Sequence, residues 1–226
     1  MTATTSDMTV RALGETPADA PYECTLCPRL AAFHTSNRAA FPDFHNGPVV
    51  SFGDPRARLL IVGLAPGLKG ANRTGRPFTG DYAGDLLYGT LAKFGFSKGT
   101  FRADPADGLT LRDCMVTNAV RCVPPQNKPT PAEINTCRRY LIARIAALPR
   151  LEAIVALGRI AHESVLPALD RKRSAHPFGH GAVHDVGPRL RLFDSYHCSR
   201  YNTNTGVLTT EMFEAVFAAV RAHLDR

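Results

Sequence analysis

Three loops rich in glycine and polar residues carry most of the side chains that could do chemistry. The first runs over residues 63–81 and contains GLAPG and GRPFTG. Glycines let a ligand approach the backbone closely and let the chain adopt positive φ angles. No Gly-Lys-Ser/Thr follows at the spacing of a phosphate-binding P-loop. By itself, this loop indicates only a site for an anionic or planar ligand.

The other two loops add polar groups at the ends of predicted strands. Asn118 offers one donor and one acceptor to the edge of a base, or else it caps the loop. His197 could donate a hydrogen bond to a carbonyl oxygen that gains charge during a reaction, although a lone histidine there is more often structural. Neighbouring Ser, Arg and Asn side chains favour a functional role, because they offer several phosphate donors in one place.

The six cysteines are the third chemical feature. Cys24 and Cys27 form a CxxC pair, and Cys122 and Cys137 form a more widely spaced pair. Without a secretory signal pattern, metal ligation or catalysis is expected before disulfides. Zinc ribbons usually contain two short CxxC pairs, whereas thiolates from distant segments suit an iron–sulfur cluster equally well. The residues leave both metals open, and Cys137 could also be plain core.

Length and composition limit the class of protein. The chain has 226 residues, of which 44% are hydrophobic, so it suits one α/β domain with a full core. No apolar run approaches the roughly 20 residues that cross a bilayer. Residues 1–20 lack a signal pattern, so we expect a cytoplasmic protein with a disordered segment at 1–20 and one domain over 21–226. The net charge of +7 is compatible with a polyanionic partner or with solubility alone.

Predicted strands and helices alternate along the chain. Buried strands are predicted over residues 58–63, 114–118, 153–157 and 190–195. Helices are predicted over 84–94, from 131 after the capping box of Thr130, over 158–165, and from about 209. This order predicts a single-domain, three-layer α/β/α fold with a central, mainly parallel four-stranded sheet. The active site of such folds lies outside the carboxyl ends of the strands, where the three loops fall. Residues 170–188, rich in Arg, His and Gly, are predicted to form a long surface loop.

Four segments in this order resemble the uracil-DNA glycosylase superfamily, and most closely its family 5. They are GLAPG at 63–67, NRTGRPFTGD at 72–81, TNAVRCVPPQNKPT at 117–130 and SYHCSRYNTNTG at 195–206. The resemblance implies a monofunctional glycosylase that hydrolyses the N-glycosidic bond of uracil, and of other deaminated bases, in DNA and so starts base excision repair. The alternatives are a catalytically silent module that recognises damaged DNA, and a zinc-bearing nucleotide hydrolase on the same α/β plan.

The resemblance implies roles for residues of a pocket that receives a flipped base. Phe78 matches the position that stacks on the base, Asn118 the residue that reads its pairing edge, and His197 the histidine that stabilises the leaving base. Gly63 and Gly67 belong to the matching base-binding loop.

The same loop lacks a group to hold water. Ala65 occupies the stretch where other branches carry a polar or acidic residue, a lack that family 5 shares. We expect the water to be held by backbone groups or by another side chain, Asn72 being favoured over Asp81. The lack also predicts a broad substrate range and keeps the silent module open as an alternative.

The cysteine pairs match the family's ligands to a [4Fe–4S] cluster, so the resemblance implies a structural cluster held by Cys24, Cys27, Cys122 and Cys137. Cys114 and Cys198 match no ligand position.

DNA is the implied partner, and contact is expected from polar and basic side chains near the loops: Arg121, Lys128, Arg200 and Asn202. No lysine occupies a nucleophile position, so a lyase step is not expected. We expect a monomer, because the sequence shows no heptad pattern or long apolar face.

Overall fold

The computed structural model describes residues 16–226, so residues 1–15 of the predicted N-terminal segment lie outside the described part. The described chain contacts the domain almost from its first residues. The carbonyl of Ala18 accepts a hydrogen bond from Arg121, and Asp19 pairs with Arg121 and Arg144. The domain predicted to begin at residue 21 therefore also includes Ala18 and Asp19.

A six-stranded sheet forms the centre of the fold, in the order β1-β5-β2-β6-β8-β7. The four central strands run parallel: β5 (Cys114–Asn118), β2 (Leu59–Gly63), β6 (Ala153–Leu157) and β8 (Arg191–Ser195). They correspond to the four predicted strands. Two short antiparallel strands, β1 (Phe52–Gly53) and β7 (Val183–Asp185), extend the edges. Strands this short are too brief to produce a period-two pattern, so the sequence did not reveal them.

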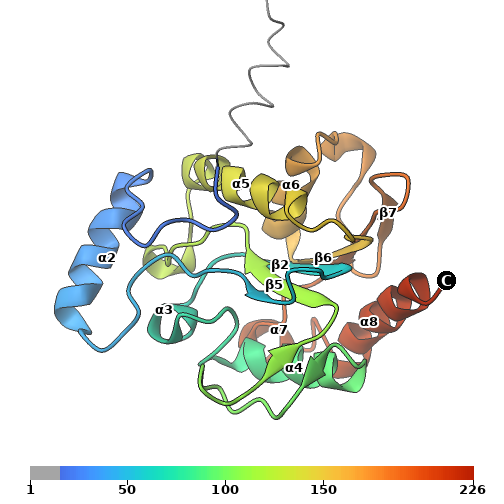
Figure 1. Cartoon of the computed structure of the whole chain (residues 1–226), viewed down its shortest axis with the longest axis horizontal. Coiled ribbons are helices and arrows are strands. Elements are labelled where there is room, and N and C mark those ends of the chain that lie inside the picture. The colour runs from blue at the N-terminus through green and yellow to red at the C-terminus, as the bar shows by residue number, and fades with distance from the viewer. Residues whose placement is uncertain (1–15) are drawn as a thin grey trace, which may run out of the picture.

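Helices cover both faces of the sheet and confirm the three-layer prediction (Figure 1). On one face lie α5 (Pro131–Ala146) and α6 (Arg159–Ala168), and on the other lie α4 (Tyr82–Lys93) and α8 (Thr210–Leu224). The remaining helices are α2 (Pro28–Ala40), α3 (Ala71–Thr74) and α7 (Arg200–Asn204), with short 3-10 turns η1 (Pro125–Asn127) and η2 (Arg173–Ala175). A separate hairpin pairs β3 (Ser97–Lys98) with β4 (Thr110–Leu111).

The central strands are buried on both sides, which explains their continuous apolar sequences. In β2, Leu59 and Ile61 pack into the core under α4 and α8, whereas Leu60 and Val62 pack into the core under α5 and α6. Alternate side chains of a strand point to opposite faces, so one strand serves two cores. This arrangement fixes the carboxyl end of β2, where the first loop begins.

The observed first residues of α5 and α4 can be compared with the predicted ones. Thr130 accepts a hydrogen bond from the Glu133 amide at 3.3 Å, and the Glu133 carboxylate accepts one from the Thr130 amide at 2.7 Å, which confirms the capping box. By contrast, α4 begins at Tyr82, earlier than the predicted residue 84, and Asp81 is its N-cap residue. The beginning of α4 therefore brings Asp81 into the first loop.

Residues 170–188 form more than the predicted surface loop, because they contain η2 and strand β7. Within the described residues, no helix combines the length and the apolar character needed to span a membrane.

Candidate active site

A cleft of about 650 Å³ opens at the carboxyl ends of the parallel strands. Its size is within the roughly 300–1,000 Å³ that is usual for ligand sites. A narrow recess adjoins it, and the two share Ala65, Gly67, Asp81, Ala83 and His197 as lining residues. Phe78 and Asn118 also line the recess, together with Pro66 and Ala71. The predicted pocket residues from three separate loops therefore meet in one place.

Gly63 allows the two sides of the recess to come together. It is the last residue of β2 and pairs with Asn118, the last residue of β5. A Cβ atom at Gly63 would lie 2.5 Å from Asn118 Oδ1 and 2.5 Å from Phe78 Cζ. Gly63 does not itself line the recess, so its role is to let Asn118 and Phe78 approach each other.

Two polar side chains of the recess have no hydrogen-bond partner among the described residues. Asn118 is 3% exposed, yet neither its amide nor the imidazole of His197 bonds to another described side chain or backbone group. Both polar groups border the recess and are free to pair with a ligand there. Exclusion of water lowers the pKa of His197 to about 4. The ring is therefore neutral at pH 7 and can donate from one nitrogen.

Phe78 forms a flat wall beside His197. Its ring lies 6.0 Å from the imidazole, centroid to centroid, at an interplanar angle of 25°. The backbone of Phe78 has φ 53°, a left-handed value that is uncommon for a bulky residue. Such a conformation costs about 1–3 kcal/mol and persists only where the surroundings enforce it.

A buried ion pair and a tyrosine enforce it. Arg76 donates two hydrogen bonds, both of 2.8 Å, to the two carboxylate oxygens of Asp107. These bonds hold the pKa of Asp107 far below its usual range. The hydroxyl of Tyr88 donates to the carbonyl of Pro77 at 2.7 Å. The two residues before Phe78 are thus held in place, Arg76 by Asp107 from the loop between β3 and β4, and Pro77 by Tyr88 of α4.

Asp81, and not Asn72, lies where it could hold water. Asn72 is fully buried, lines neither the cleft nor the recess, and donates to Asn46 Oδ1 at 3.0 Å. Its predicted role is therefore corrected to a structural one. Asp81 lines both spaces, and a Cβ at Gly70 would lie 2.4 Å from its Oδ2. Loss of bulk water around its carboxyl group raises the pKa of Asp81, with a further increase from Asp85.

The predicted DNA contacts divide into two groups. Arg200 is exposed, lines the cleft and lies 5.7 Å from the centroid of the Tyr82 ring. Lys128 is exposed beside Asn127, another lining residue. Both side chains are therefore accessible to solvent at or beside the cleft.

Arg121 and Asn202 have internal partners instead. Arg121 is 1% exposed and bonds to Ser51 at 2.8 Å and Asp19 at 3.2 Å. A side chain so enclosed cannot reach a phosphate, so its predicted DNA contact is corrected to a structural ion pair. Asn202 Nδ2 donates to the carbonyl of His197 at 2.8 Å, which makes it a residue that positions His197.

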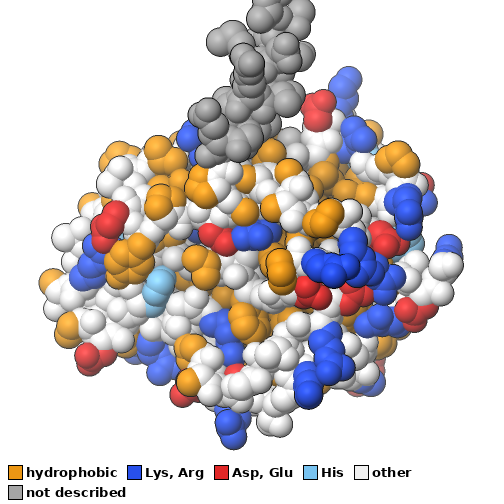
Figure 2. Space-filling model, in the orientation of Figure 1, with side chains coloured by type: hydrophobic (Ala, Val, Ile, Leu, Met, Phe, Trp, Pro, Cys, Tyr) orange, Lys and Arg blue, Asp and Glu red, His pale blue; other side chains and the backbone are white. Residues whose placement is uncertain are grey.

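Some exposed residues near the cleft were not predicted. Lys69, Tyr82 and Asn127 line it, and Tyr201, which follows Arg200 in α7, is 74% exposed. The sequence indicated a turn at Asn127, because this residue lies in a segment that contains Pro and Asn. In the structure Asn127 adopts φ 56°. On the face shown in Figure 2, basic side chains are scattered among acidic ones, so the net charge does not form one continuous stripe there.

The four predicted metal ligands gather at one site around the start of α2 and α5. Cys24, Cys27, Cys122 and Cys137 line one small cavity together with Tyr140. The Arg121 amide donates to Cys137 Sγ at 3.3 Å. Burial, followed by the neighbouring Cys137, raises the pKa of Cys27 to about 11.

The spacing of the sulfurs bears on which metal fits. No three of these described sulfurs lie within 4.8 Å of one another. A single zinc ion with Zn–S bonds of about 2.3 Å would hold its sulfurs about 3.8 Å apart. Cys114 and Cys198 are buried in a different core, apart from the four predicted ligands.

Comparisons with known proteins identify the family. The model of the uracil DNA glycosylase superfamily matches residues 50–221. A Thermus thermophilus protein named type-5 uracil-DNA glycosylase is 48% identical over 195 residues, covering 84% of this chain and 89% of its own length. A Mycobacterium tuberculosis protein of the same name is 43% identical over 202 residues, covering 86% of this chain and 75% of its own length. A Pyrobaculum aerophilum protein of that name is 37% identical over 203 residues, covering 88% of this chain and 88% of its own length. The chain therefore belongs to the uracil-DNA glycosylase superfamily, on its type-5 branch.

Proposed function

We propose that the protein is a monofunctional DNA glycosylase that hydrolyses the N-glycosidic bond of uracil in DNA and leaves an abasic site. The observation that carries this proposal is the recess, where the Phe78 ring meets the unpaired Asn118 amide and the unpaired His197 imidazole. A flat heterocycle with a polar edge would stack on the Phe78 ring and pair with the Asn118 amide. The names of the type-5 relatives support the same activity.

His197 stabilises the leaving base in this mechanism. As the bond from C1′ to the base nitrogen breaks, its electron pair moves onto the base, and a carbonyl oxygen of the base gains charge. The neutral imidazole donates a hydrogen bond to that oxygen, a type of contact that typically contributes about 10²–10³-fold to the rate. Asn202 supports the geometry by bonding to the His197 carbonyl.

Asp81 positions the attacking water. Its carboxylate lines both the cleft and the recess, whereas Ala65 offers only a methyl group. The water oxygen bonds to C1′ and its proton passes to the carboxylate or to solvent. Among the lining residues, the one lysine, Lys69, lines the outer cleft and not the recess, so no Schiff base with C1′ is expected.

The lining of the recess favours a broad range of deaminated bases. Besides the polar residues, small side chains surround the space, among them Ala65, Ala71 and Ala83. An enzyme discriminates strongly between bases when the wrong base leaves polar groups of the pocket without hydrogen-bond partners. The recess has few such groups, so a base other than uracil would leave few of them unpaired. Duplexes containing hypoxanthine or xanthine test this range. If both remain intact while uracil is removed rapidly, the recess is selective and the proposal of breadth is wrong.

We further propose that Cys24, Cys27, Cys122 and Cys137 hold a structural [4Fe–4S] cluster. The shared lining of one small cavity by the four cysteines, and the hydrogen bond from the Arg121 amide to Cys137 Sγ, support it. The cluster would tie the segment before α2 to the loop after β5, beside the cleft. Cys122→Ser should yield colourless, poorly soluble protein, whereas the control Cys198→Ala should stay yellow-brown. A stable, coloured Cys122→Ser protein with full iron content would exclude Cys122 as a ligand.

Release of free uracil tests the proposed function. Purified protein is incubated with a duplex that contains one labelled uracil opposite guanine, and the free base is separated by chromatography. The wild type should release uracil, and Asn118→Ala should release it much more slowly. Tight binding of the duplex without release would instead favour a module that only recognises damage, with Ala65 as the reason.

A further inference from the structure

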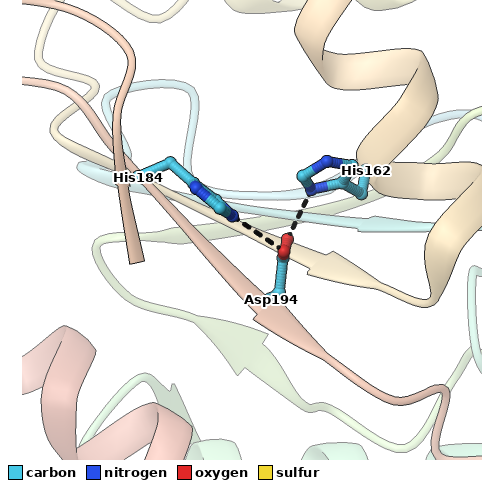
Figure 3. Close-up of side chains that lie close together, drawn as sticks. All are labelled: His162, His184 and Asp194. Atoms are coloured by element: carbon cyan, nitrogen blue, oxygen red, sulfur yellow. Dashed lines mark hydrogen bonds and ion pairs between the residues drawn. The ribbon is translucent and has the colours of Figure 1, made fainter. Parts of the chain in front are cut away.

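Two histidines and an aspartate form a buried cluster that the proposed glycosylase mechanism does not use (Figure 3). His162 comes from α6, His184 from β7 and Asp194 from β8. Asp194 is fully buried, and its two oxygens face different imidazoles: Oδ1 lies 2.7 Å from His162 Nδ1, and Oδ2 lies 3.0 Å from His184 Nε2.

The partners of His162 fix where its proton can lie. Its Nε2 lies 2.9 Å from the carbonyl oxygen of His176, which can only accept a hydrogen bond, so Nε2 carries a hydrogen. In the neutral ring, Nδ1 then has a lone pair directed at Asp194 Oδ1. Two lone pairs do not approach within 2.7 Å unless a cation lies between them. That cation is either a second proton or a metal ion.

The separation of 2.7 Å between His162 Nδ1 and Asp194 Oδ1 is that of a hydrogen bond, and the surroundings of the cluster also suit a metal ion. The three donor atoms lie within 4.8 Å of one another. His162 gives its other N–H to a backbone carbonyl, which is how metal-binding histidines are usually oriented. Among the described residues, Asp194 forms ion pairs only with these histidines, so no arginine or lysine neutralises its buried charge. The Phe178 ring, 5.5 Å from His162, provides an apolar wall.

We propose that His162 Nδ1, His184 Nε2 and the Asp194 carboxylate bind a divalent transition-metal ion, with zinc as the best match. Zinc accepts imidazole and carboxylate ligands and is satisfied by three protein ligands with water in the fourth position. His184 lies on an edge strand with 10% of its side chain exposed, which gives the ion and that water an approach from solvent.

The metal would fasten residues 170–188 to the sheet. This segment supplies the carbonyl of His176 and the amide of Gly179, which donates to Asp194 Oδ2 at 3.3 Å. It also supplies β7. Asp194 lies near the end of β8, and His197 lies in the loop that follows this strand. The ion would therefore stabilise the start of the third active-site loop. Zinc should therefore raise the melting temperature, because a ligand that binds only the folded state stabilises it.

Cobalt(II) is the probe that distinguishes this site from the cysteines. Tag-free, full-length protein is titrated with Co²⁺ while the visible spectrum is recorded. One equivalent should give d–d bands without the sulfur-to-cobalt charge-transfer band that thiolates produce. His184→Ala should weaken this binding by at least about tenfold. His176→Ala is the matched control, because it removes a neighbouring imidazole and keeps the carbonyl that orients His162.

Asp194→Asn is a second variant, because it keeps the shape of the side chain and removes the charge. Circular dichroism verifies that each variant is folded, and His184→Gln replaces His184→Ala if the latter is not. The proposal is overturned if the wild type shows no such bands, or if the bands persist unchanged in a folded His184 variant. Either result would mean that a proton, and not a metal ion, joins His162 to Asp194.

Discussion

The Phe78 ring and the His197 imidazole lie nearly parallel, 6.0 Å apart between centroids and 25° apart in plane. The two residues come from different loops, one before α4 and one after β8. Their side chains border the same recess as the free Asn118 amide. In the proposed mechanism, these three side chains would stack on one flat base, pair with its edge and stabilise its charge.

His197→Gln tests charge stabilisation. The substitution removes the imidazole donor, so the single-turnover rate of uracil release should fall by about 10²–10³-fold. Binding of the uracil duplex should change little, because the contact strengthens only as the base leaves. A similar loss of rate and affinity would contradict this role and indicate that His197 mainly binds the ground state.

The pH profile tests the protonation states in the cleft. Because the pKa of His197 is lowered to about 4, kcat/KM should show no inflection near pH 6.5. Asp81 must be ionised to hold water, and its pKa is raised above 3.8, so activity should fall toward acid pH. Asp81→Asn should lower the rate and flatten that acid limb. An inflection near 6.5 that disappears in His197→Gln would contradict the neutral imidazole.

Asp81 and Asn72 can be separated by matched substitutions. Asp81→Ala should reduce turnover strongly and leave the fold intact, because its side chain lines the cleft. Asn72→Ala should lower the melting temperature, because it breaks a buried hydrogen bond to Asn46. Its activity, measured below the melting temperature, should remain near that of the wild type. The opposite pattern would restore Asn72 as the residue that holds water.

The Arg76–Asp107 pair is expected to be essential for stability. Asp107→Ala leaves a buried guanidinium unpaired, and the free energy of unfolding should fall by about 3–5 kcal/mol. Lys93→Ala removes an exposed partner of Glu214 and should cost less than about 1 kcal/mol. Urea denaturation measures both variants. Equal small losses would mean that Phe78 holds its left-handed backbone without this pair.

The sequence predicted the parts of the fold that depend on local pattern. Strands 114–118 and 153–157 match residue for residue, because each begins with a run of apolar residues that is buried in the sheet. Asn118 and His197 could then be placed after two parallel strands, at the same edge of the sheet. Their meeting with Phe78 was implied by family resemblance, since no local pattern brings a loop of residues 63–81 against either strand.

The errors concern polar residues whose partners are distant in sequence. Arg121 was predicted to contact DNA because it is basic and lies in an active-site loop, but Asp19 pairs with it inside the protein. Asn72 is buried against Asn46 in the same way. The His162–Asp194 contact joins a helix to a strand and also left no local signal. Such pairings become visible only when the chain is folded.

The most direct measurement of the central claim uses a labelled duplex with one uracil opposite guanine, treated with hot alkali after incubation with the protein. Strand scission is expected only after alkali, which would show that the base has been removed and the sugar left in place. His197→Gln is expected to slow this reaction at saturating enzyme. Scission without alkali would reveal a lyase, and an intact strand after alkali, despite firm binding of the duplex, would contradict glycosylase activity altogether.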